Sequence, residues 1–427
     1  MMKKLAALVV AVLTMCIYGV YADEVNSFTV GSEQELAALA NYNEINSVTL
    51  TKDLDMTGFK FETCVIKKLT GEFNGNGHTI KNLTLYGKAN ANTGLIAELT
   101  GSVAGLKLEN INITDYISNG SVVGTVAGLV PEGSTASVTD CIVTGNIENR
   151  ISGGVYMGAL IGSASGTIDN KTVLSVKNCV TKVNISCTTS NYAGGILGRA
   201  ATYVRLDADK CAVLGDISGN GTACGIVGWF TSGDFEISLS DTYLSGVIEG
   251  KNKFGIAYNR YSSPSVIICE NFYYDKTKNP DPYSWSKFQM LYSGESKISG
   301  TVQAKTTDEI KALELEGFEI RPGELDGYPL PVWKYGEEKL NKIALDGNKA
   351  DVSVIDGGTY TVVFAAYSGE KLNCTAFVTK EFSSGENTAD APENFNTVNS
   401  DCVKAFLLRS VDSMLPVCEA AIYKQGE

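Results

Sequence analysis

The sequence is short of the residues that most metal sites and nucleic-acid-binding proteins need. It has one histidine, His78, among 427 residues, which excludes a multi-histidine metal site. Lysine and arginine number 35 against 48 acidic residues, and this acidic balance argues against a phosphate backbone as the main partner. Only 9 prolines accompany 44 glycines, and charged residues are few for the length. This balance favours a protein of strands and corners over a helical one.

Long apolar runs are confined to the N-terminus. Lys3 and Lys4 precede an apolar stretch over residues 5–20, and small residues before Asp23 provide a cleavage site. The pattern predicts a secretory signal peptide over residues 1–22, with a retained membrane anchor as the alternative. No later stretch is long enough to cross a bilayer, so we expect a secreted protein without membrane insertion after cleavage.

The cysteines lack a pattern that points to chemistry. Of the 11 cysteines, all but Cys16 follow residue 22, and secretion would permit disulfides. They are dispersed, however, and form neither a close-spaced framework nor a metal-ligand pair. We expect no metal and no cofactor, and disulfide pairing stays open.

Residues 23–93 read as an N-terminal cap that leads into a repeat. Ser32 can cap a short helix, because Glu35 follows at the third position and Leu36 and Leu39 share a face. A strand at residues 48–50 comes next. The Asn-Gly pairs within residues 74–77 then mark tight turns before the chain returns to strand.

A Gly-apolar-apolar-small unit recurs through residues 94–275. Its starts are Gly94, Gly128, Ala159, Gly195, Gly225 and Gly255, at intervals of 34, 31, 36, 30 and 30 residues. A second apolar element recurs in step with it, at residues 111–113, 141–147, 179–185, 211–217 and 242–248. Two independent elements in one phase are typical of a solenoid repeat.

Period-two alternation within the second element predicts which side chains point inward. It places Ile111, Cys141, Cys179, Cys211, Thr242 and Phe272 at one equivalent position, and Ile147, Ile185, Ile217 and Ile248 at another. Stacked turns would join such rows into a continuous core, which predicts an all-β fold built on a right-handed parallel β-helix. The cysteines then serve as small buried apolar residues. The glycines mark corners that need positive φ or close backbone approach, and they do not form a phosphate cradle.

The repeats, together with the segment Asn74-Gly75-Asn76-Gly77-His78-Thr79-Ile80 and the later segment over residues 327–333, resemble the GLUG-motif repeat proteins. These are secreted and surface β-solenoids of bacteria. The resemblance covers about residues 23–334 and departs at Gly128 and Gly255, where the unit is incomplete. It implies surface display or adhesion, sometimes beside carbohydrate-active modules, and offers no catalytic residues to carry over.

The sequence changes character twice after the repeat. A polar stretch interrupts it after residue 275, and residues 276–339 read as a segment that closes one end of the solenoid. This segment includes a short helix at 307–313 with Thr306 or Thr307 as its cap. Residues 340–427 then carry apolar strands at 360–367, 373–378 and 402–408, which predict a small Ig-like antiparallel β-sandwich. That part is similar to C-terminal modules of secreted clostridial proteins, which implies a Gram-positive secreted context.

One charged constellation could serve an enzyme. Asp207 and Asp209 share a strand face, and Arg199 and Arg205 lie near them in sequence. Polysaccharide lyases and glycosidases on β-helices use carboxylates in this way, so these four residues are the catalytic candidates of a polysaccharide-active enzyme. The alternative is a set of solvated, outward-facing charges.

A weaker candidate lies in the first turns. Asp53 and Asp55 form a second spaced carboxylate pair. His78 could act as a base, but it sits among turn residues whose asparagines and glycines already have a structural role. The structural interpretation is therefore preferred for this segment.

Aromatic residues accompany the repeat. Tyr156 and Tyr192 each lie three residues before equivalent units, so we expect them to stack on adjacent turns, and Trp229 and Tyr258 follow later units. Rows of aromatic rings on a solenoid face provide flat platforms for sugar rings, whereas simple ladder packing is the alternative.

These observations favour a secreted or cell-surface adhesion protein without catalytic activity, in which the solenoid presents an extended face to glycan or protein. A polysaccharide-active enzyme and a structural envelope protein are the alternatives. The acidic balance excludes nucleic acid as a partner, and the sequence leaves the oligomeric state and wall attachment open.

Overall fold

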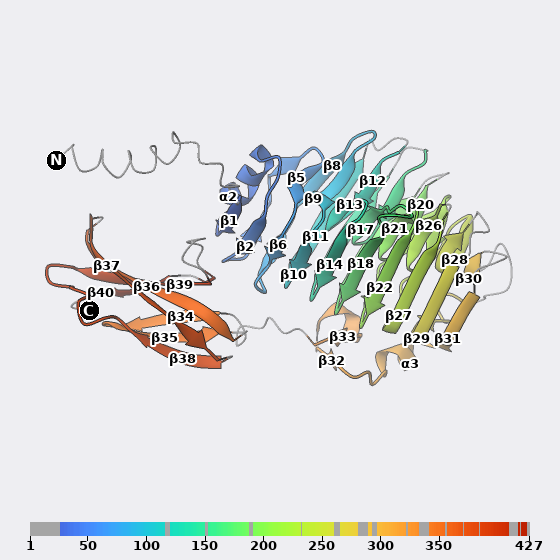
Figure 1. Ribbon diagram of the computed structural model, residues 1–427. Coiled ribbons are helices and arrows are strands. Elements are labelled where there is room, and N and C mark those ends of the chain that lie inside the picture. The colour runs from blue at the N-terminus through green and yellow to red at the C-terminus, as the bar shows by residue number, and fades with distance from the viewer. Residues whose placement is uncertain are drawn as a thin grey trace.

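The computed structural model describes residues 26–115, 120–149, 153–187, 191–231, 233–259, 265–280, 289–292, 297–321, 323–332, 341–354, 357–369, 371–383, 385–409, 417–418 and 420–424. The predicted signal peptide lies outside these residues. Figure 1 shows the strands from β1 to β31 as successive rungs of one elongated stack, with a second group of strands, β34 to β40, beside its first turns. The predicted parallel β-solenoid followed by antiparallel sheets is therefore confirmed.

Two parallel sheets build the solenoid. The larger sheet has 19 strands in the described residues. They are β1 (Ser27–Val30), β2 (Ser47–Leu50), β3 (Leu54–Asp55), β4 (Lys60–Phe61), β6 (Glu72–Asn74), β7 (Thr79–Lys81), β8 (Thr84–Gly87), β10 (Ser102–Ala104), β11 (Lys107–Asp115), β14 (Thr135–Thr139), β15 (Ile142–Glu148), β18 (Thr172–Lys177), β19 (Val180–Cys187), β22 (Val204–Asp209), β23 (Ala212–Val213), β24 (Ile217–Gly219), β27 (Phe235–Leu244), β29 (Ser265–Asp275) and β31 (Lys297–Lys305).

The smaller sheet contains the glycine-rich repeat and has 12 described strands. They are β5 (Cys64–Leu69), β9 (Asn92–Leu99), β12 (Val122–Gly124), β13 (Ala127–Val130), β16 (Tyr156–Gly158), β17 (Ile161–Ala164), β20 (Tyr192–Gly194), β21 (Leu197–Ala200), β25 (Thr222–Cys224), β26 (Val227–Phe230), β28 (Asn252–Asn259) and β30 (Gln289–Tyr292). Each repeat unit is thus a pair of short strands joined by a bend.

Rows of like side chains fill the interior, as the alternation predicts. Ile147 pairs in register with Ile185, Ile185 with Ile217, and Ile217 with Ile248, and all four are buried. Each fully buried side chain of this kind contributes about 1.5–3 kcal/mol relative to an exposed one. The stacked rows form one continuous core that no single turn could make.

The predicted inward row that contains Cys141, Cys179 and Cys211, called the cysteine row below, is confirmed except for its first member, Ile111. Cys141, Cys179 and Cys211 follow one another in register, flanked by Thr242 and then Phe272 on later turns. On the preceding turn the partner of Ile142 is Lys107, which places Leu106 beside Cys141, whereas the predicted Ile111 pairs with Gly145. The prediction for Ile111 fails because this turn has two corner residues with positive φ, Gly105 and Asn110. Sequence spacing favours the residue after Asn110, which is Ile111, whereas strand pairing uses the residue after Gly105, which is Leu106.

The repeat glycines are required by close backbone approach rather than by positive φ. A Cβ on Gly198 would lie 2.5 Å from the Gly162 carbonyl oxygen and 2.7 Å from backbone atoms of Met157 on the preceding turn. A side chain at this point would separate the two short strands. The glycines therefore hold a tight crease, in which each second strand packs onto the first strand of the turn before it.

Short helical segments stand at both ends of the solenoid. Helix α2 (Glu33–Ala38) is capped by Ser32, whose side chain accepts from the Glu35 amide, and it continues into η1 (Leu39–Asn41). Helix α3 (Thr307–Lys311) begins with a capping box between Thr306 and Glu309. Both caps were predicted from the sequence. No helix in the described part of the chain is long and apolar enough to cross a membrane.

The segment after the last turn packs along the side of the solenoid rather than only across its end. Strand β32 (Phe318–Ile320), η2 (Leu325–Gly327) and strand β33 (Pro329–Pro331) follow α3. Tyr328 and Leu330 bury a separate apolar row on the larger sheet that includes Tyr243 and Tyr273. The Tyr243 hydroxyl donates to the Pro329 carbonyl at 2.5 Å. Besides the closure of one end that the sequence predicts, this segment therefore covers an outward apolar row of the larger sheet.

Two antiparallel sheets around one core form the C-terminal part. The first has β34 (Lys342–Asp346), β35 (Lys349–Val354) and β38 (Gly385–Asp390), and the second has β36 (Gly358–Ser368), β37 (Lys371–Phe382), β39 (Cys402–Leu408) and β40 (Ala421–Lys424). Val352, Ala389, Phe364 and Val403 from both sheets share a buried cluster. The three predicted strands correspond to β36, β37 and β39 of the second sheet, whose strand order is β37-β36-β39-β40.

Candidate functional site

Four aromatic side chains from consecutive turns meet on the smaller sheet. Tyr156 on β16 and Tyr192 on β20 are register partners, and their ring centroids lie 5.6 Å apart, as predicted. Trp229 on β26 stacks on both, at 5.1 Å from Tyr156 and 4.7 Å from Tyr192. Tyr258 on β28 continues the series at 6.2 Å from Tyr192. We call these four residues the aromatic stripe.

The rings of the stripe are nearly parallel and partly open to solvent. The interplanar angles of the four contacts lie between 14° and 19°. All four side chains are half-buried, unlike Phe254, which stacks on Tyr258 at 5.2 Å and is buried. Offset stacks of this kind contribute about 0.5–1.5 kcal/mol per pair beyond area burial. The stripe is therefore a rigid aromatic surface whose rings support one another.

The crease brings the stripe together from two rows. Tyr156 and Tyr192 stand on the first short strand of their turns, whereas Trp229 stands on a second strand, in register with Arg199. Because Gly198 lets the second strand lie against the backbone of Met157, side chains of the two rows converge. A bulkier residue in the crease would separate the two rows.

Arg199 belongs to this surface. Its Nε donates to the Ser163 Oγ at 3.0 Å, and its Cζ lies 4.4 Å from the centroid of the Tyr156 ring. A guanidinium over an aromatic face gains about 0.5–1 kcal/mol at an exposed site and more where water is excluded. The sequence held a signal for this placement, because Arg199 follows Gly198 as Trp229 follows Gly228 one repeat later.

Residues without aromatic rings bound the stripe along the first row, polar on one side and aliphatic on the other. Thr222 and then Asn252 follow Tyr192 in register, and the Asn252 side-chain amide donates to the Thr222 hydroxyl at 3.3 Å. On the other side, Val122 precedes Tyr156. The aromatic surface thus extends over four turns and ends where the row becomes polar.

The charged constellation proposed for catalysis is divided between the two sheets. Arg205 and Asp207 lie on β22 of the larger sheet, where the Arg205 Nε is 3.0 Å and 2.9 Å from the two Asp207 carboxylate oxygens. The Arg205 Nη1 is 3.3 Å from Glu236, and the hydrogen bond and charge of Asp207 raise the pKa of Arg205. Asp209 is on the same strand, whereas Arg199 lies in the other sheet. The structure does not bring all four residues together.

His78 has a carboxylate neighbour that sequence reasoning missed. Its Nδ1 lies 3.2 Å from the Asp53 Oδ1, which also accepts from the Thr79 amide at 2.8 Å. Residues 25 positions apart meet here because they occupy successive turns. Asp55 does not take part in this contact. Hydrogen bonds from Thr57 and Asn82 keep the pKa of its carboxyl group well below the usual range.

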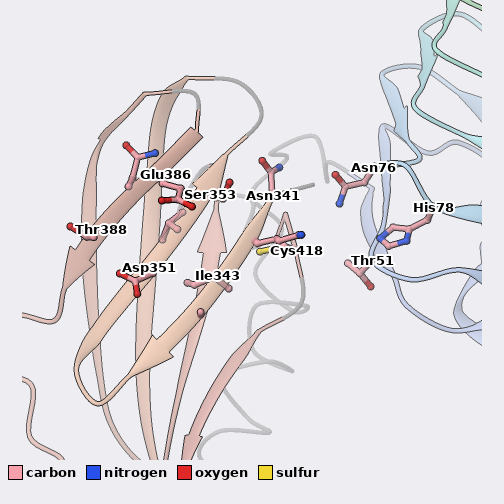
Figure 2. A pocket seen from close by; sticks show the side chains of 14 residues that line it. Thr51, Asn76, His78, Asn341, Ile343, Asp351, Ser353, Glu386, Thr388 and Cys418 are labelled. Carbon is pink, nitrogen blue, oxygen red and sulfur yellow. The ribbon is translucent and has the colours of Figure 1, made fainter. Parts of the chain in front are cut away.

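A polar cleft of about 900 Å³ adjoins His78. Figure 2 shows Thr51, Asn76 and His78 on the solenoid side and Asn341, Ser353 and Cys418 on the side of the C-terminal sheets. The Asn76 side-chain amide donates to the Val417 carbonyl at 3.2 Å across this boundary. Hydroxyl, amide and carboxylate groups line the cleft together with apolar residues such as Ile343 and Val352, so it offers both hydrogen bonds and apolar contact.

The buried cysteines have low expected reactivity. The nine cysteines whose side chains the structure describes are free thiols. Burial raises the pKa of Cys211 to about 12 and that of Cys179 well above its usual value. A thiol held neutral in this way is a poor nucleophile. Within the described ranges, no three His, Cys, Asp or Glu residues gather in a way that could hold a metal ion.

Comparison with known proteins supports the fold. No family model matches the chain. A segment of 86 residues, 20% of the chain, is 41% identical to a halomucin from Haloquadratum walsbyi, and the match covers 1% of that protein. The crystal structure of a "putative immunoglobulin A1 protease" from Bacteroides ovatus matches with a TM-score of 0.51 and 16% identity, over 72% of this chain and 92% of that one. At this identity the likeness shows a common fold, and the chain stands as a β-solenoid that these comparisons place in no family.

Proposed function

We propose that this chain is a secreted or surface-associated binding protein without catalytic activity, and that the aromatic stripe is its glycan-binding surface. The observation that carries the proposal is the set of four nearly parallel, half-buried rings on consecutive turns. The surface setting rests on the signal peptide predicted for residues 1–22.

The geometry of the stripe suits a chain of sugars. Sugar rings present apolar C–H groups, which pack against the parts of the aromatic rings that neighbouring rings leave uncovered, while their hydroxyls need polar groups at the rim. Successive parallel strands repeat about every 4.8 Å, so four turns offer a linear series of contacts rather than one pocket. Because the rings already support one another, little side-chain entropy is lost when a ligand binds.

Retention on immobilised polysaccharides tests this proposal. We expect Tyr192→Ala and Trp229→Ala to abolish retention on whichever glycan an array identifies, with circular dichroism unchanged. Tyr86→Ala is the matched control, because Tyr86 is an exposed tyrosine, 38% accessible, on the larger sheet. Unchanged retention of both stripe variants would refute the assignment of the surface.

A second candidate function is turnover of a polysaccharide in the polar cleft. It is favoured by His78, which lines the cleft and is hydrogen-bonded to Asp53, since a carboxylate that orients an imidazole is a common acid–base arrangement. An assay for new reducing ends on pooled polysaccharides separates the two functions. Product formed by the native protein and lost in His78→Gln would establish turnover, whereas retention without product supports binding alone.

A further inference from the structure

Arg199, which lies against the aromatic stripe, carries a charge that no described residue neutralises. Arg205 and Arg321 each face two carboxylates, Asp207 with Glu236 and Glu319 with Glu324. Arg199 makes no ion pair with a described residue. Its contacts are the Ser163 hydroxyl and the Tyr156 ring. This half-buried guanidinium therefore carries a positive charge in a surface of aromatic rings.

The terminal nitrogens of Arg199 are its available donors. Only Nε takes part in its hydrogen bond to Ser163, so within the described residues Nη1 and Nη2 donate to no protein group. A guanidinium presents two parallel N–H groups that match a carboxylate in a two-point contact. Ser163 and Tyr156 hold the planar group in place, so its orientation is set before a ligand arrives.

No acidic residue stands beside Arg199 in its row. Its register partners are Ser163 and Trp229, and Leu129 comes next beyond Ser163. Glu98 follows Leu129, three strand spacings from Arg199, or about 14 Å. Glu98 also accepts from the Asn92 side chain at 3.4 Å. Along this row Arg199 is thus a positive charge without an acidic neighbour on the adjacent strands, although the whole chain is strongly acidic.

We infer that Arg199 binds the carboxylate of an acidic sugar whose neighbouring rings stack on the aromatic stripe. This inference rests on the proposed glycan-binding function and names its ligand class. The net charge of −13 repels a densely charged polymer, and one local cation cannot offset that repulsion along a chain. The fitting ligand is a mostly neutral glycan with isolated carboxylates, such as uronic or sialic acid residues.

Paired oligosaccharides test the inference by calorimetry. We expect the native protein to bind sialyllactose or a glucuronic-acid-capped lactose about tenfold more tightly than lactose, the size of one charge-assisted contact. Comparison of the two acidic probes identifies the carboxylate source. A stronger preference for sulfated lactose than for both carboxylated probes would overturn the assignment to carboxylate.

Variants then assign the effect to one side chain. Arg199→Gln should lower the affinity for the acidic probes to that for lactose and leave lactose binding in place. Arg199→Lys should retain only part of the preference, because it keeps the charge without the two-point contact. Arg205→Gln, the same charge change on the larger sheet, should leave the preference intact. An unchanged preference in Arg199→Gln would overturn the inference.

A further measurement needs no variant. Free glucuronate should compete with the acidic probe for the native protein, whereas its neutral methyl ester should compete no better than glucose. Equal competition by the acid and its ester would refute a carboxylate contact. Failure of the native protein to bind any of the glycans, neutral or acidic, would instead refute the proposed function itself.

Discussion

Two rows of aromatic residues run along the sides of this solenoid, and they differ in how far the chain itself covers them. Tyr243 and Tyr273 on the larger sheet are covered by the segment that carries α3 and β33, and Tyr243 is 0% exposed. The aromatic stripe on the smaller sheet is half-buried. In a solenoid, an apolar residue that recurs at the same position of successive turns forms a row. When such a row faces outward, either the chain itself covers it or it remains available to a partner. The chain covers the first row, and we propose that a glycan covers the second.

The largest expected effect separates the two rows by stability. Tyr243→Ala should lower the free energy of unfolding by about 3–5 kcal/mol, because it removes a fully buried ring and its bond to Pro329. Tyr192→Ala should cost less than Tyr243→Ala because the Tyr192 ring is only half-buried, although it loses three stacking contacts of about 0.5–1.5 kcal/mol each. Urea unfolding measures both values. Equal losses would contradict the distinction, since they would make the stripe a packing element like the covered row.

The crease provides the next test. Gly198→Ala places a Cβ against the backbone of Met157 and should cost about 1–3 kcal/mol while it separates the two rows of the stripe. Glycan retention should fall with it. Gly154→Ala is the control, because its nearest neighbour would be the Tyr156 hydroxyl at 4.0 Å. Full retention in Gly198→Ala would show that the stripe does not depend on the crease.

A buried carboxylate tests how the covering segment is held. Asp275 is 0% exposed and accepts from Ser245 at 2.9 Å and Thr307 at 2.8 Å. Asp275→Asn replaces one acceptor oxygen by a donor and should cost about 1–3 kcal/mol. Limited proteolysis should then cut within residues 306–332 sooner than in the native protein. Asp209→Asn, a half-buried change, should leave the cleavage rate unaltered.

The smallest effect at neutral pH concerns the cysteine row. The folded state holds the pKa of Cys211 at about 12 against an ordinary value of 9.0. The unfolded chain therefore loses this proton first, and stability should fall between pH 9 and pH 12 by about 1 kcal/mol per pH unit from this thiol. Cys211→Ala should show a shallower alkaline loss in thermal unfolding. An identical slope would show that Cys211 does not contribute.

Short-range patterns were sufficient for much of the fold. Capping by Ser32 and Thr306, the isoleucine row from Ile147 to Ile248 and the stacking of Tyr156 on Tyr192 all follow from local spacing and one repeat period. The position of Ile111 was predicted incorrectly because two left-handed corners compete on one turn. Sequence spacing identifies candidate corners, but only the pairing of strands decides which corner is aligned with the corner of the next turn.

The sequence by itself determined the repeat, its inward rows and the glycines that permit close approach, because each depends on residues within one turn or at a fixed interval. Tertiary structure alone decided which faces meet. It paired His78 with Asp53, placed Arg199 over Tyr156 instead of beside Asp207, and laid Tyr328 over Tyr243. These contacts join residues from different turns or different sheets, and their partners are set by the register and bend of the stack, which local sequence spacing does not encode.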